Sequence, residues 1–260
     1  MALSQIDIHL TRDKEIVLLH DPRLDRTTNG KGMIKDTDWY GDLEDLRTKK
    51  GDCKIPRLND VLDLLMRPDV REKNVWFVLD IKADNPPEIL SNVHALLNSE
   101  AYKDFDFSDI ITFGVWTPNF LPLLDTLFPT YNSAFIGVTL TGASLVFFDK
   151  VKSFNLNFAC LVGKDGTAFI KKAHMAGKNV FVWTVNDPNQ ARECVRWGVD
   201  AVLGDDVNML LDVCCREGKT KDGEKVAGLE DGEWHTMTRS WYYYGLRSFL
   251  ERVSKSRFGV

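Results

Sequence analysis

Two neighbouring stretches decide how this chain folds, QIDIHL at residues 5–10 and HDPRLDRTTNGKG at residues 20–32. In the first, apolar and polar side chains alternate, which is typical of a strand with one apolar and one polar face. Gln5, Asp7 and His9 share the polar face. A second apolar run at residues 15–19 follows a short polar break, so the sequence predicts a β-hairpin.

The register of this hairpin decides which polar side chains meet. If Asp13 and Lys14 form a two-residue turn, Asp7 lies directly opposite His20, with Cβ atoms about 4.5–5.5 Å apart. A loop that is one residue longer moves every side chain to the other face. Lys14 is a poor residue for a primed turn, which favours glycine. The alternative is a half-exposed hairpin with an ordinary surface ion pair.

Length and composition limit the class of protein. The chain has 260 residues, 44% of them hydrophobic, enough for one large domain with a tail. A net charge of −5 does not indicate the basic surface that nucleic-acid binding usually requires. The five cysteines show no metal-ligand spacing, and no signal peptide is apparent, so we expect reduced thiols and a cytoplasmic protein. No apolar run approaches the length of a membrane span.

Apolar runs of strand length alternate with helical patterns along the chain, which favours a closed (β/α) barrel over an open doubly wound sheet. Further strands are predicted at residues 74–81, 110–116, 134–140, 157–162, 179–185 and 199–203, and helices at 56–67, 86–98, 120–128, 144–153, 167–176, 188–197 and 207–215. We therefore expect a barrel over residues 1–216, a polar linker over 217–233, and an amphipathic aromatic and basic tail over 234–260.

Several motifs in order resemble the glycerophosphodiester phosphodiesterase family. They are the HDPRLDRTTNGKG stretch, IPRL at residues 55–58, LDIK at 79–82, VWTVN at 182–186 and GVDAVLGD at 198–205. LDIK and ITFGVW at 111–116 look most like its phosphatidylglycerol phospholipase C branch. The resemblance implies an α/β fold, a TIM (β/α)8-type barrel of the PLC-like phosphodiesterase kind. Because the family's opening Gly-His-Arg-Gly segment is missing here, we expect the first strand and helix to be lacking.

The resemblance also implies chemistry. A divalent metal ion, Ca²⁺ or Mg²⁺, would be held by Asp7 and Asp80, with Gln5 at the position of a family glutamate. His20 matches one of two catalytic histidines acting as general acid and base. Lys82 is matched to a catalytic position that meets the phosphate. Trp183 would pack against the organic part of the substrate, with a core role as the alternative.

Departures from the family pattern qualify this expectation. The other histidine and a phosphate-binding arginine belong to the missing segment, and the neutral Gln5 predicts weak metal affinity. His9 shares the face of Asp7, and we interpret it as a solvated or hydrogen-bonded residue. The predicted function is a phosphoric diester hydrolase acting on glycerophosphodiesters or glycerophospholipids. The alternatives are an impaired or truncated relative that binds phosphodiester or lipid head groups without turnover, and an unstable fragment.

The tail alternates aromatic and basic residues and predicts one of two roles. Leu246, Phe249, Leu250 and Val253 share a helical face. The segment is too short and too charged to span a bilayer, but it suits the head-group interface of an anionic membrane. The alternative is an amphipathic helix packed back on the barrel. The first role predicts peripheral contact with an intracellular membrane.

Overall fold

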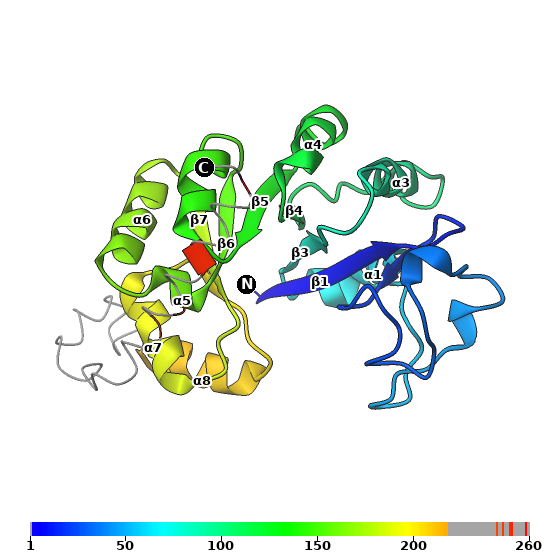
Figure 1. The fold of residues 1–260 in the computed structure, drawn as a ribbon, viewed down its shortest axis with the longest axis horizontal. Coiled ribbons are helices and arrows are strands. Elements are labelled where there is room, and N and C mark those ends of the chain that lie inside the picture. The colour runs from blue at the N-terminus through cyan, green and yellow to red at the C-terminus, as the bar shows by residue number, and fades with distance from the viewer. Residues whose placement is uncertain (1, 218–242, 244–245, 247–249, 252–257, 259–260) are drawn as a thin grey trace. The chain divides into compact units, whose positions relative to one another are not determined.

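A computed structural model describes residues 2–217 together with 243, 246, 250, 251 and 258 (Figure 1). The chain divides into two compact units, Met1–Ser133 and Ala134–Val260. The predicted linker over 217–233 and most of the predicted tail lie outside the described residues.

The first unit is built on a four-stranded sheet in the order β2-β1-β3-β4. Its strands are β1 (Ala2–Leu10), β2 (Ile16–Leu18), β3 (Val75–Ile81) and β4 (Ile111–Val115). β1, β3 and β4 are parallel, and β2 runs antiparallel to β1 as the outer strand of the hairpin. The five residues of β4 are all buried, as expected for a parallel sheet covered on both faces.

The hairpin loop is one residue longer than the predicted turn, so the predicted pairing of Asp7 with His20 is wrong. Ile8 pairs with Leu18, and the backbone N–H of Thr11 donates to the Glu15 carbonyl at 3.0 Å. The loop therefore has three residues, and its last one, Lys14, takes the left-handed conformation with φ of 71°. Such three-residue loops commonly end on a residue with positive φ.

Helices connect the parallel strands of this unit. They are α1 (Leu58–Met66), α2 (Pro68–Arg71), α3 (Glu88–Leu97) and α4 (Leu121–Leu127), with single 3-10 turns η1 (Ile34–Asp36), η2 (Leu43–Asp45) and η3 (Pro118–Phe120). The helices predicted at 56–67, 86–98 and 120–128 are confirmed within a few residues. The loop after β2 has its own apolar cluster, made by Val17, Leu24, Ile34, Trp39, Leu43 and Ile55.

The second unit repeats the strand and helix alternation. Its strands β5 (Asn132–Gly137), β6 (Ser153–Asn157), β7 (Asn179–Trp183) and β8 (Ala201–Val202) are parallel and adjacent in sequence order. The connecting helices are η4 (Gly142–Phe147, one stretch of π-helix), α5 (Phe158–Leu161), α6 (Lys164–Met175), α7 (Pro188–Trp197) and α8 (Val207–Glu217). Asp187 caps α7 and Gly198, with φ of 70°, ends it.

The prediction of a strand at residues 157–162 is wrong. Strand β6 lies before this stretch, and the short helix α5 occupies most of it. Asn157 ends β6, and its side-chain oxygen accepts the N–H of Ala159 at 3.0 Å, which starts α5. Every residue of α5 is buried. A short run that is apolar on all sides has no periodicity to separate helix from strand. The helix predicted at 144–153 ends earlier for a related reason, since residues 153–157 form β6.

The alternation of parallel strands and helices places the fold in the α/β class and follows the winding of a (β/α)8 barrel. Among the described residues, three parallel strands lie in the first unit and four in the second. That is one parallel strand fewer than the eight of a complete barrel. None of the described helices is long and apolar enough to cross a membrane.

Candidate active site

The parallel pairing of β1 with β3 brings two acidic residues together. Asp7 and Asp80 are direct partners in this register, so their side chains leave the sheet side by side. Both lie toward the carboxyl ends of their strands, the edge at which barrel enzymes carry their active sites. Side chains two residues apart on a strand share a face, so Lys82 follows Asp80 to the same place.

Lys82 bridges the two carboxylates. Its ammonium nitrogen lies 2.8 Å from Asp7 Oδ1 and 2.8 Å from Asp80 Oδ2. The Lys82 side chain is 14% exposed, that of Asp7 is 19% exposed, and that of Asp80 is fully buried. A buried carboxylate without a partner is strongly disfavoured, and this ion pair supplies the partner.

Two further side chains complete the surroundings of Asp80. The Gln5 amide donates to Asp80 Oδ2 at 2.9 Å, and the Trp116 indole N–H donates to Asp80 Oδ1 at 2.7 Å. Sequence reasoning assigned no role to Trp116. The strand pairing explains this contact. Asp80 pairs with Gly114 across β3 and β4, and Trp116 lies two residues after Gly114, on the same face of the sheet.

Burial and the shared ammonium shift the pKa values of these groups in different directions. Burial raises the pKa of Asp80 to about 7, with Lys82 opposing the rise and Asp7 adding to it. Burial also acts to raise the pKa of Asp7, but its hydrogen bond and charge interaction with Lys82 outweigh this and hold it below its ordinary value. Burial acts to lower the pKa of Lys82, and the two carboxylates reverse this and raise it. The cluster therefore keeps Lys82 charged.

His20 lies in the loop that follows β2, close enough for its charge to lower the pKa of Asp7. The N–H of Leu19 donates to the Asp7 carbonyl at 3.1 Å, which holds the start of this loop against β1. His20 Nδ1 lies 2.8 Å from Asp21 Oδ1, and the guanidinium of Arg26 binds the same carboxylate. These hydrogen bonds, that of Arg26 first, hold the pKa of Asp21 well below its usual range. The His20 side chain is 68% exposed, so its other nitrogen is open to a ligand.

His9 is buried, in agreement with a hydrogen-bonded rather than a solvated residue. Its Nε2 lies 3.5 Å from the carbonyl oxygen of His20, and its Nδ1 lies 3.7 Å from Asp84 Oδ2. Burial lowers the pKa of His9, which favours the neutral ring. Nearby, Asn85 joins the end of β1 to the loop after β3 through three side-chain hydrogen bonds.

The predicted site residues thus divide between the units. Gln5, Asp7, Asp80 and Lys82 form one contact cluster, with His20 next to it. Trp183 ends β7 in the second unit, where its indole N–H donates to the Asn155 carbonyl at 3.0 Å.

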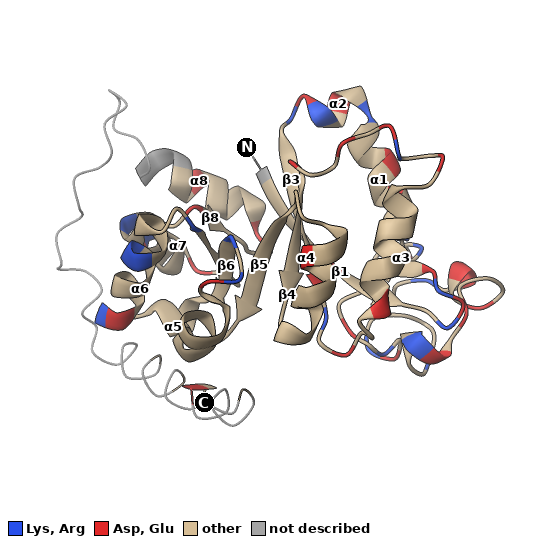
Figure 2. Ribbon diagram, turned by 90° about the horizontal axis from the view of Figure 1, so that it is seen from above, with Lys and Arg blue, Asp and Glu red and all other residues tan. Residues whose placement is uncertain are grey.

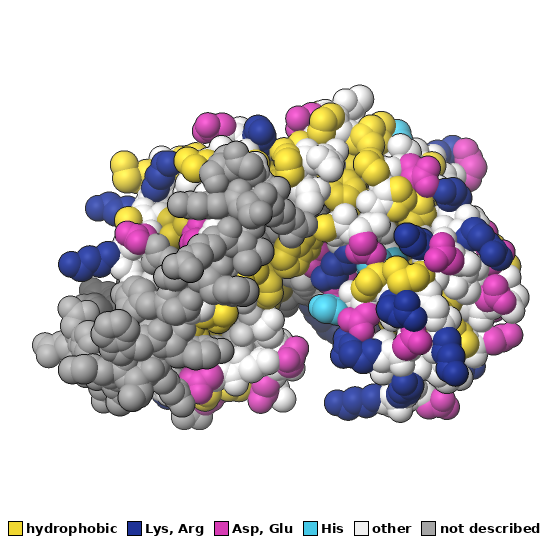
Figure 3. All heavy atoms as spheres, in the orientation of Figure 1, with side chains coloured by type: hydrophobic (Ala, Val, Ile, Leu, Met, Phe, Trp, Pro, Cys, Tyr) yellow, Lys and Arg dark blue, Asp and Glu magenta, His cyan; other side chains and the backbone are white. Residues whose placement is uncertain are grey.

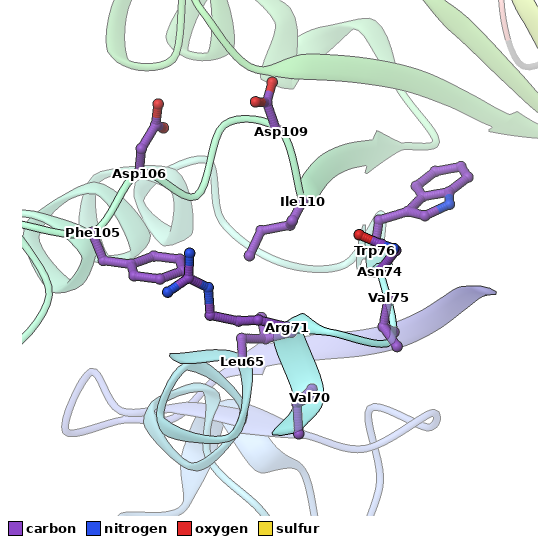
Figure 4. Close-up of a pocket in the computed structure, with 10 residues that line it drawn as sticks. All are labelled: Leu65, Val70, Arg71, Asn74, Val75, Trp76, Phe105, Asp106, Asp109 and Ile110. Atoms are coloured by element: carbon purple, nitrogen blue, oxygen red, sulfur yellow. The ribbon is translucent and has the colours of Figure 1, made fainter. Parts of the chain in front are cut away.

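A pocket in the first unit lies at the other ends of the strands. Figure 4 shows Arg71 beside the ring of Phe105, with Val75 at the start of β3 and Ile110 just before β4. The pocket holds about 320 Å³. Because it opens at the amino ends of these strands, it is separate from the Asp80 cluster. Figure 2 colours the charged residues on the ribbon; they lie mainly on loops and helices, and β4 contains none. Both signs are interspersed over the visible face of the first unit (Figure 3).

A parallel α/β chain with acidic and basic groups at the carboxyl ends of its strands has the architecture of a (β/α)8-barrel enzyme. The model of the glycerophosphoryl diester phosphodiesterase family matches residues 5–209. The chain belongs to this family, which is a family of phosphoric diester hydrolases. Members generally use a divalent metal ion.

Individual relatives agree with the family assignment. The "Putative glycerophosphodiester phosphodiesterase YhdW" of Bacillus subtilis is 27% identical over 226 residues, which cover 78% of this chain and 82% of the relative. A glycerophosphodiester phosphodiesterase of Caldanaerobacter subterraneus is 24% identical, over 82% of this chain and 86% of the relative.

Two solved structures show the same fold. A phosphodiesterase of Oleispira antarctica, in complex with the product sn-glycerol-3-phosphate, has a TM-score of 0.66 at 18% identity and covers 83% of this chain and 85% of its own. A glycerophosphodiester phosphodiesterase of Parabacteroides distasonis has a TM-score of 0.65 at 22% identity, with 82% and 84% covered.

Proposed function

We propose that this chain hydrolyses glycerophosphodiesters, with Lys82 holding the phosphate and His20 transferring protons. The observation that carries the proposal is a charged ammonium fixed by two carboxylates next to an exposed histidine. Family membership and the glycerol phosphate product bound by the Oleispira relative support this substrate class.

Each side chain has a part that follows from its contacts. An ammonium group has three N–H donors, and Lys82 donates one of them to Asp80 Oδ2 at 2.8 Å, while its ammonium lies 2.8 Å from Asp7 Oδ1. In the proposal the same ammonium donates to a phosphate oxygen. Asp21 accepts at His20 Nδ1, so Nε2 is the nitrogen that exchanges a proton with the substrate.

In the proposed reaction the free hydroxyl oxygen of the glycerol part of the substrate forms a bond to phosphorus while the bond from phosphorus to the leaving alcohol breaks. Water then adds to phosphorus and opens the resulting cyclic phosphate to glycerol phosphate. His20 Nε2 takes the proton of the attacking hydroxyl as general base, or returns one to the leaving oxygen as general acid. Among the described residues, His20 is the side chain that the proposal assigns to these transfers.

The described residues do not fit a resident Ca²⁺ or Mg²⁺ ion, the cofactors that the resemblance implied. Hard divalent cations favour several oxygen ligands with negative charge. Here Gln5 directs its amide N–H at Asp80, and both Asp80 oxygens already accept hydrogen bonds. Among the described residues no group of three His, Cys, Asp or Glu side chains is arranged to hold a metal ion. No step of the proposed reaction is therefore routed through a metal ion.

The experiment follows release of glycerol phosphate from a water-soluble glycerophosphodiester by ³¹P NMR. His20→Asn is expected to lower kcat about 10²–10⁴-fold, the usual size of a general acid–base contribution. His174→Asn is the matched control, because His174 is a partly exposed histidine paired with Asp200 at 3.0 Å in the second unit. Unchanged turnover in His20→Asn would contradict the assignment. Wild-type binding of the diester with no turnover would favour the alternative function, recognition of head groups without hydrolysis.

The same proposal includes a wider range of substrates, the glycerophospholipids at the surface of an intracellular membrane. Action on these lipids would depend on contact of the tail over 234–260 with the membrane. The described tail residues support its alternative, packing against the second unit. The hydroxyl oxygen of Tyr243 accepts the Gln190 amide at 2.6 Å, and the rings of Phe258 and Phe135 lie 6.4 Å apart. The other tail residues lie outside the described residues, so membrane contact and a cytoplasmic location stay predictions.

A further inference from the structure

The position between Asp7 and Asp80 is already filled by a cation from the chain itself. The Lys82 ammonium lies 2.8 Å from an oxygen of each carboxylate, and its side chain is only 14% exposed. It also lies 5.6 Å from the centre of the Trp116 ring, a cation–π distance. The ammonium thus lies between two carboxylates and next to an aromatic ring.

Gln5 fits an ammonium at this position better than a metal ion. Its amide donates to the same Asp80 oxygen that accepts from Lys82. A donor so placed reduces the negative charge that this oxygen offers to an ion. A carboxylate at position 5 would instead stand against the buried carboxylate of Asp80, where like charges repel.

The distances disfavour binding of a divalent ion between Asp7 and Asp80 while the Lys82 ammonium is there. Ca²⁺ or Mg²⁺ binds carboxylate oxygens at about 2.0–2.6 Å. An ion bound to the oxygens that contact Lys82 would therefore lie within about 5 Å of the ammonium, in a site with little solvent to screen the repulsion. The strand register places Asp7 directly beside Asp80, so both cations would compete for the same carboxylate oxygens.

We propose that the ammonium of Lys82 replaces a divalent metal ion in this chain, and that an ion enters between Asp7 and Asp80 only when Lys82 is removed. This goes beyond the proposed function and does not depend on turnover. It predicts that one substitution converts a site without metal into one with metal.

The test is calorimetric titration with MgCl2 and with CaCl2, paired with thermal unfolding in each ion. The proteins are the wild type, Lys82→Met, and the double variant Gln5→Glu with Lys82→Met. Lys103→Met is the matched control, because Lys103 pairs with Glu100 on the exposed surface at 2.7 Å. Asp7→Asn reports whether any ion that binds does so at this site.

We expect no saturable binding to the wild type or Lys103→Met up to about 1 mM free ion, the weak end of protein calcium sites. Lys82→Met should bind, and the double variant should bind at least about tenfold more tightly because it adds a third carboxylate. At ten times Kd, the Tm of each binding variant should rise by about 3–6 °C, while that of the wild type stays constant.

Wild-type binding below about 1 mM that Asp7→Asn abolishes would overturn the proposal. Binding that survives Asp7→Asn lies elsewhere and counts as none at this site. The proposal is also overturned if folded Lys82→Met gains no affinity. If Lys82→Met folds only in the presence of either ion, that rescue supports the proposal. If it does not fold in any condition, the wild-type titration decides alone.

Discussion

Asn85 links the ends of β1 and β3, and its substitution gives the sharpest test of how the cluster is positioned. The side chain is 8% exposed. Its Oδ1 accepts the Leu10 N–H at 3.0 Å, and its Nδ2 donates to the carbonyls of Ile8 at 2.9 Å and Lys82 at 3.2 Å. Both backbone segments carry cluster residues.

Asn85→Ala leaves one buried N–H and one buried C=O of β1 without the side-chain partner. Each unsatisfied buried group costs about 1–3 kcal/mol, so we expect a loss of about 2–6 kcal/mol in the free energy of unfolding. For a chain of this size the loss corresponds to a Tm about 4–24 °C lower. Urea unfolding followed by circular dichroism measures it.

Asn85→Asp adds a dependence on pH. An oxygen then replaces the amide NH₂ and faces the two carbonyl oxygens, and burial should raise the pKa of the new carboxyl above the unfolded value of about 3.9. The folded state then binds more protons than the unfolded state between these two values. Stability should therefore fall as pH rises through this window, by about 1.4 kcal/mol per pH unit. At low pH the protonated acid can donate in place of the amide.

Asn98→Ala is the matched control, since Asn98 is exposed and its side chain donates one bond, to the His94 carbonyl at 2.8 Å. We expect its loss to stay below about 1 kcal/mol. A loss below 1 kcal/mol in Asn85→Ala, or a variant Asn85→Asp whose stability relative to wild type does not change between pH 4 and 8, would refute the reasoning.

Three other outcomes follow from the described contacts. Gly166→Ala should lower the free energy of unfolding by about 3 kcal/mol or more, because the added Cβ would overlap the Leu161 carbonyl. Gly177 lies in open space with φ of 68°, so Gly177→Ala should lower it by only about 1–2 kcal/mol. Thermal unfolding of both variants measures the difference. Burial acts to raise the pKa of Asp13, but bonds from one hydroxyl and two backbone N–H groups hold it low, so Asp13→Asn should lose stability at neutral pH and the loss should shrink below about pH 4. If the tail contacts membranes as its sequence predicts, deletion of residues 234–260 should abolish co-sedimentation with anionic vesicles at low salt. The packing contacts of Tyr243 and Phe258 instead predict that sedimentation is unchanged.

The sequence alone determined the alternation of strands and helices and the family, because buried strands and amphipathic helices leave periodic patterns that need no tertiary partner. It also placed Asp7, Asp80 and Lys82 at strand ends. Family motifs added His20, whose loop position has no periodicity to predict it.

Tertiary structure decided what these residues contact. The three-residue loop after β1 moved His20 out of the pairing with Asp7, because one extra residue shifts the register of a whole strand. The indole of Trp116 reached Asp80 only through the pairing of β3 with β4. The contact of Lys82 with two carboxylates was also not predicted, since the register of β1 on β3 places both acids within reach of one ammonium. Contacts between strands separated by about seventy residues depend on register, and no local pattern in the sequence records it.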